Sequence, residues 1–62
     1  MKNKILELRK NKELTQETLA KKCNVTRQTI NAIENDRYDP TLALAFKIAD
    51  VLDTTVDDLF KQ

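Results

Sequence analysis

Residues 14–35 read LTQETLAKKCNVTRQTINAIEN, and this stretch contains two short helical patterns separated by a few residues. Thr15 and Thr26 are suitable N-caps, because a threonine hydroxyl can accept a hydrogen bond from the unpaired N–H groups of a helix's first turn. The two patterns predict helices over 16–23 and 27–34. Two short helices joined by three or four residues are typical of a helix-turn-helix.

The helix predicted over 27–34 has an apolar side and a polar side. At 100° per residue, Ile30 and Ile33 face the core. The other side carries a guanidinium, two amides and a methyl group, which pair with guanine, adenine and thymine in the major groove. A cation at a helix N-terminus opposes the macrodipole at a cost of about 0.3–1 kcal/mol, and DNA would offset that cost. We therefore expect base reading by Arg27, Gln28, Asn31 and Ala32.

Polar side chains next to these two helices are candidates for contacts with the DNA backbone. Gln16 begins the first helix, where backbone N–H groups and a side-chain amide can meet a phosphate. Arg37 and Tyr38 follow the second helix and could hold the backbone from the other side. The alternative is that Arg37 and Tyr38 belong to an ordinary polar loop without a DNA contact, in which Tyr38 packs on Pro40. The expected backbone contacts are Gln16, Thr26, Asn35, Arg37 and Tyr38.

The rest of the chain predicts three more helices and no strand. One helix is expected over 3–11 and another from Thr41 to about residue 52. Thr55 and Asp58 fit a capping box for a short last helix. The apolar stripe expected on the fourth helix is Leu42, Ala45, Phe46, Ala49 and Leu52. The prediction is an all-α fold of five helices in one domain over 1–62, with the helix-turn-helix at about 16–34.

Composition excludes several classes of function. The 62 residues include no Gly, no His and one Cys, so no internal disulfide and no Cys/His metal site is expected. No nucleophile–base pair can be assembled, so we expect neither an enzyme nor a cofactor. No small-molecule site is apparent. The chain has no apolar run of the roughly 20 residues that a membrane span needs, so a cytoplasmic protein is expected.

Charge is distributed unevenly along the chain. Residues 1–31 carry eight basic and three acidic side chains, whereas residues 32–62 carry three basic and seven acidic ones. The total is only +1, but the halves have net charges of +5 and −4. Such an asymmetry suggests one surface for a polyanion and another for a different partner.

The end of the chain is a candidate contact between two copies. Val56, Leu59 and Phe60 lie three or four residues apart on the last predicted helix. One short helix can turn only part of this set toward a small core, and exposed apolar patches usually mark contacts. We expect Leu59 and Phe60 at a dimer interface and Val56 inside. The alternative is that all three complete the core.

Several short motifs together resemble one known family. They are LTQ at 14–16, LA at 19–20, RQTI at 27–30, IE at 33–34 and the later Pro40. With them, nearly the whole chain resembles the lambda-repressor-like helix-turn-helix family, also called the xenobiotic-response-element family, and especially its minimal single-domain members. Where that family often has Gly, this chain has Glu13, Asn24, Asp36 and Asp53.

The resemblance implies a five-helix, homodimeric transcriptional regulator that acts on a near-palindromic operator in double-stranded DNA. We expect this regulator to be a repressor. It implies a phosphate contact for Gln16 and an ion pair between Arg9 and Glu34. The alternative is a protein-interaction module, such as an antitoxin that also binds DNA.

Overall fold

The computed structural model describes residues 1–60, and these residues form five helices and no strand. The all-α fold expected from the sequence is therefore confirmed. In chain order the helices are α1 (Ile5–Asn11), α2 (Gln16–Lys22), α3 (Arg27–Glu34), α4 (Leu42–Val51) and α5 (Val56–Leu59).

Threonine residues determine where four of these helices begin. In each case the threonine hydroxyl accepts a hydrogen bond, 3.0–3.2 Å long, from the backbone N–H three residues later. This bond satisfies one of the N–H groups that a helix leaves unpaired at its start. The capping residues are Thr15, Thr26, Thr41 and Thr55.

The first four helices all end in the same way. One residue just beyond each helix has a left-handed backbone, with φ between 54° and 60°. The next residue's N–H then bonds back to the carbonyl five residues earlier, as Leu14 does to Arg9 at 2.9 Å and Arg37 does to Ala32 at 2.8 Å. This bonding pattern usually uses glycine. Here the left-handed residues are Glu13, Asn24, Asp36 and Asp53.

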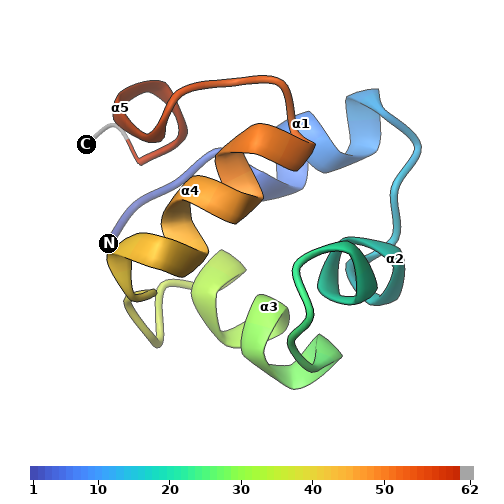
Figure 1. Cartoon of the computed structure of the whole chain (residues 1–62), viewed down its shortest axis with the longest axis horizontal. Coiled ribbons are helices and arrows are strands. Elements are labelled where there is room, and N and C mark those ends of the chain that lie inside the picture. The colour runs from blue at the N-terminus through green and yellow to red at the C-terminus, as the bar shows by residue number, and fades with distance from the viewer. Residues whose placement is uncertain (61–62) are drawn as a thin grey trace.

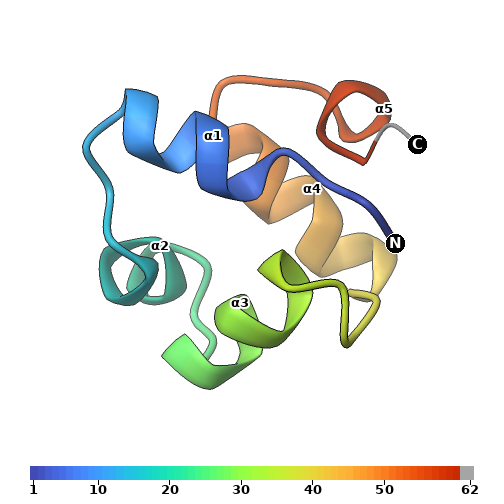
Figure 2. The ribbon, with the colours of Figure 1, turned by 180° about the vertical axis from the view of Figure 1, so that it is seen from behind.

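The helices surround one small core. Helices α2 and α3 pack against each other at one end of the molecule, and α5 packs beside α4 at the other (Figure 1). Seen from behind, α1 crosses in front of α4, and the chain's first residues run toward α4 and α5 (Figure 2). The buried side chains that form the core are Ile5, Leu19, Ala20, Cys23, Ile30, Ile33, Ile48, Ala49, Leu52 and Leu59.

The apolar stripe expected on α4 is partly wrong. Leu42 and Phe46 are 67% and 59% exposed, whereas Ile48, which the expected stripe omitted, is fully buried. The buried side of α4 also includes Ala45 and Ala49. Leu42 and Phe46 lie one turn apart, so α4 is apolar both on its buried side and on part of its outer side.

Candidate nucleic-acid interface

Helix α3 has the two sides expected from the sequence. Ile30 and Ile33 are buried at 0% and 1% exposure, which orients the helix on the core. Arg27 and Gln28 are exposed on its first turn. Asn31 is half-buried, and so is Ala32. The four predicted base-reading residues therefore differ in access to solvent, with the first two the most accessible.

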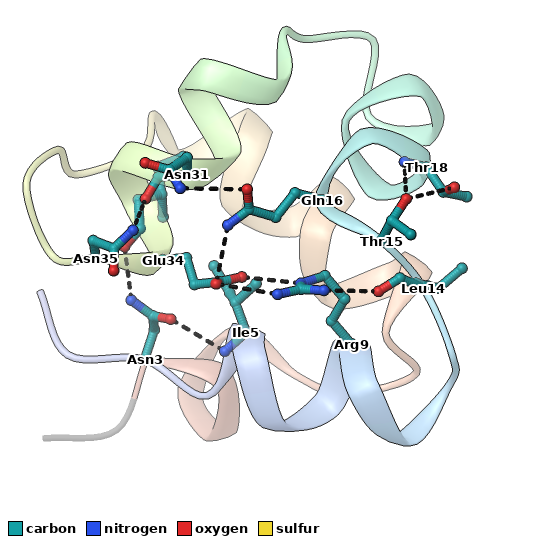
Figure 3. A network of polar contacts seen from close by, with 11 residues as sticks. Asn3, Ile5, Arg9, Leu14, Thr15, Gln16, Thr18, Asn31, Glu34 and Asn35 are labelled. Carbon is teal, nitrogen blue, oxygen red and sulfur yellow. Dashed lines mark hydrogen bonds and ion pairs between the residues drawn. The ribbon is translucent and has the colours of Figure 1, made fainter.

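A nearly buried ion pair connects α1 to the end of α3. Arg9 Nε donates to Glu34 Oε1 at 3.0 Å, and Arg9 Nη2 donates to Glu34 Oε2 at 3.2 Å (Figure 3). The two side chains are only 11% and 8% exposed. Arg9 Nη1 also donates to the Leu14 carbonyl at 2.9 Å. The pair implied by the resemblance is present, and it also holds the loop that leads into α2.

Gln16 joins this ion pair to Asn31, one of the predicted base-reading residues of α3. Its Nε2 donates to Glu34 Oε2 at 3.1 Å, and its Oε1 accepts from Asn31 Nδ2 at 3.3 Å (Figure 3). Both ends of the Gln16 amide are therefore bonded inside the protein. We could not anticipate this link from the sequence, because Gln16 and Asn31 stand 15 residues apart with no pattern relating them.

The residues predicted to touch the DNA backbone lie around α3. Thr26 caps the helix, and its hydroxyl is also 3.0 Å from that of Thr29. Asn35 is exposed beyond the last turn, where its Nδ2 donates to the Asn31 carbonyl at 2.8 Å. Arg37 is exposed and Tyr38 is 49% exposed in the loop that follows. These positions remain predictions as DNA contacts.

Asn3 makes one further contact at the end of α3, which no sequence pattern predicts. Asn3 Nδ2 donates to the Ile33 carbonyl at 2.8 Å, while Asn3 Oδ1 accepts from the Ile5 N–H at 3.1 Å. The same side chain thus satisfies the start of α1 and the end of α3. Asn3 therefore precedes α1, which begins at Ile5, two residues later than predicted.

The predicted dimer surface requires a correction. Leu59 is fully buried in the core, so its assignment to an interface is wrong. The single turn of α5 directs this side chain inward and leaves Phe60 half-buried against the core. The most exposed large apolar side chains are instead Leu42 and Phe46 on α4.

The remaining chemistry of the described residues is sparse. Cys23 is 1% exposed, and burial raises the pKa of its thiol, so it is an unreactive core residue.

Residues 1–60 contain no cluster of ligands for a metal ion. None of their helices combines the length and apolarity needed to cross a membrane. An open hollow of about 550 Å³ is lined by Lys12, Leu14, Lys22 and Val51.

Comparisons with known proteins agree with this geometry. A family model described as helix-turn-helix matches residues 5–59. An HTH-type transcriptional regulator of Methanocaldococcus jannaschii is 55% identical over 60 residues, which cover 97% of this chain and 91% of that protein.

Solved structures show the same arrangement of helices. The restriction-modification controller protein C.AhdI from Aeromonas hydrophila matches with a TM-score of 0.84 and 33% identity, covering 92% of this chain and 86% of that one. A structure described as a SinR protein–SinI protein complex matches with a TM-score of 0.87 and 28% identity, covering 95% of this chain. This chain spans only 58% of the length of that second match.

Proposed function

Because the chain belongs to the lambda-repressor-like helix-turn-helix family of transcriptional regulators, we propose that it represses transcription by binding a near-palindromic DNA sequence as a homodimer. In this proposal α3 enters the major groove. The observation that carries it is the exposed first turn of α3, where Arg27 and Gln28 stand on the side opposite the buried Ile30 and Ile33.

The proposed base reading follows from the side-chain groups on α3. An arginine guanidinium bonds bidentately to guanine, a glutamine or asparagine amide bonds to adenine, and an alanine methyl touches the thymine methyl. Arg27 and Gln28 are exposed enough to reach base edges without rearrangement of the core. Asn31 and Ala32 lie one turn further along the helix and are half-buried.

The proposed backbone contacts position the protein without selecting a sequence. Gln16 retains one unused N–H on its Nε2, because a side-chain amide nitrogen carries two hydrogens and only one is bonded to Glu34. Arg37 and Tyr38 are exposed beyond α3 and can approach the phosphates there. The capping residues Thr26 and Asn35 complete this set, which flanks α3 at both ends.

The proposed homodimer uses the outer side of α4. Leu42 and Phe46 form an exposed apolar patch one turn apart, and a second copy of the chain would cover it. The start of α4 and the turn between α2 and α3 lie on opposite sides of the molecule (Figure 1). The described residues span 24 × 21 × 19 Å. Two copies joined through α4 would therefore hold their recognition helices far apart, toward the roughly 34–36 Å that one turn of duplex requires.

The test of DNA reading compares substitutions at Arg27 and Gln28. Arg27→Ala and Gln28→Ala should each lower affinity for a selected duplex by about 1–3 kcal/mol and relax the preference at one particular base pair. Arg27→Lys is the matched control: it keeps the charge but loses the bidentate geometry, so preference should fall with little change in salt dependence. Unchanged affinity and preference in both alanine variants would eliminate α3 as the recognition helix.

A further inference from the structure

Four side chains from α1, α2 and α3 form one continuous chain of hydrogen bonds that ends on the proposed base-reading side of α3. In order they are Arg9, Glu34, Gln16 and Asn31, and each is bonded to the next at 3.0–3.3 Å (Figure 3). The first two are nearly buried, with 11% and 8% of their side chains exposed. The last two are half-buried.

The direction of the bonds beyond Arg9 is dictated by the carboxylate of Glu34. Arginine can only donate, and the carboxylate of Glu34 can only accept. Gln16 must therefore turn its NH₂ group toward Glu34, which leaves its carbonyl oxygen facing Asn31. That oxygen can only accept, so Asn31 must present its own NH₂ group to Gln16.

This direction leaves Asn31 with a defined pair of groups for a ligand. One N–H of its Nδ2 is bonded to Gln16, so one N–H and the Oδ1 acceptor remain. Adenine offers a matching acceptor and donor, N7 and N6–H, in the major groove. Guanine offers two acceptors there, N7 and O6. If Gln16 were reversed, Asn31 would have to turn its oxygen inward and present two donors, which suits guanine.

We propose that Glu34, acting through Gln16, orients the Asn31 amide so that it reads adenine rather than guanine. Gln16 is then a positioning residue for specificity as well as a phosphate contact. This inference rests on the proposed function, because it assumes that α3 reads bases.

The experiment starts with duplexes selected by the wild-type protein from a random-sequence pool. Asn31→Ala, measured on single-base-pair variants of the selected duplex, identifies the pair that Asn31 reads. At that pair the wild type should prefer adenine over guanine by about 5- to 150-fold, the range expected for one bidentate contact. Gln28→Ala identifies a second base pair, which serves as the internal control.

Two substitutions at Gln16 then separate orientation from packing. Gln16→Met keeps the length of the side chain but leaves Asn31 free to reverse, so the adenine preference should fall to about threefold or less. Gln16→Glu places a carboxylate against Glu34 and weakens binding, but it still offers Asn31 only an acceptor. The adenine preference should therefore survive in Gln16→Glu. If Gln16 had a merely structural role, Gln16→Glu would lose more of the adenine preference than Gln16→Met, because the glutamate is the more disruptive change.

The outcomes distinguish this inference from the function on which it rests. Loss of the preference in Gln16→Met, its retention in Gln16→Glu, and no change at the Gln28 base pair would support it. An adenine preference retained within twofold in Gln16→Met would overturn it, and so would an Asn31→Ala variant with unchanged preference at every base pair. If the wild type selected no sequence at all, the proposed function itself would fail.

Discussion

The backbone N–H of Lys4 donates to the carbonyl of Leu59 at 2.9 Å, which ties the residue before α1 to the last residue of α5. The Leu59 side chain is fully buried next to this bond. The segment before α1 and the end of α5 thus lie side by side, and Leu59 of α5 contributes to the core. Because its side chain is buried in the core, Leu59 is not available to a second copy.

The first prediction concerns the buried leucine of α5. Leu59→Ala should lower the free energy of unfolding by about 2–5 kcal/mol, because it removes buried methyl groups and leaves a cavity. Leu6→Ala makes the same chemical change at a side chain that is 45% exposed on α1, and it should shift stability by less than about 0.5 kcal/mol. Urea denaturation followed by circular dichroism measures both. Equal effects would contradict the burial of Leu59.

The second prediction concerns the ion pair of Arg9 and Glu34. Arg9→Ala should cost about 3–5 kcal/mol, because it leaves the Glu34 carboxylate without its partner in a nearly buried site. Stability for a chain of this size is only about 3–9 kcal/mol, so the variant should be largely destabilised. The control is Lys12→Ala, which breaks an exposed pair with Asp53 and should cost about 0–1 kcal/mol.

A double-mutant cycle tests the same pair directly. Arg9→Ala and Glu34→Ala should be strongly non-additive, since each removes the same interaction. If the two effects on unfolding simply added, the interaction would contribute nothing to stability.

The third prediction concerns the left-handed residue between α1 and α2. Glu13 has φ of 57°, a conformation that costs a non-glycine residue about 1–2 kcal/mol. Glu13→Gly should therefore raise stability, by about 0.5–1 kcal/mol after the greater entropy of glycine in the unfolded chain is counted. Asn24→Gly should gain less, because asparagine tolerates this region. Thermal melting should show the higher transition temperature for Glu13→Gly, and the reverse order would refute the argument.

The fourth prediction concerns the loop after α3. Arg37→Ala should weaken DNA binding almost equally for all sequences, since a phosphate contact carries no sequence information. The slope of log affinity against log salt should decrease by about one unit, because one fewer counterion is released. Titrations at several salt concentrations measure it. Intact binding with an unchanged slope would remove Arg37 from the interface.

The fifth prediction concerns dimerisation through α4. Phe46→Asp should convert a dimer into a monomer in sedimentation equilibrium while circular dichroism stays unchanged, because this side chain is already 59% exposed. Leu6→Asp, at a side chain that is 45% exposed on α1, is the control and should remain dimeric. Phe60→Asp tests the sequence-based prediction that Phe60 contacts a second copy. A dimer that persists in Phe46→Asp would place the interface elsewhere.

The sequence by itself determined the local structure of this protein. Threonine hydroxyls mark the starts of four helices, and Asn24, Asp36 and Asp53 mark three of the ends, because capping depends on residues only a few positions apart. The two sides of α3 also follow from sequence, since the helical period separates Ile30 and Ile33 from Arg27 and Gln28. All of these are effects of neighbours along the chain.

Only the tertiary structure decided which of several apolar or polar groups would meet. The last helix offers three apolar residues and α4 offers more than one apolar side, so helix packing alone determines that Leu59 is buried and Phe46 exposed. The link from Gln16 to Asn31 likewise depends on how α2 sits on α3. Periodicity places a side chain around its own helix axis, but the distance between two helices depends on every side chain packed between them.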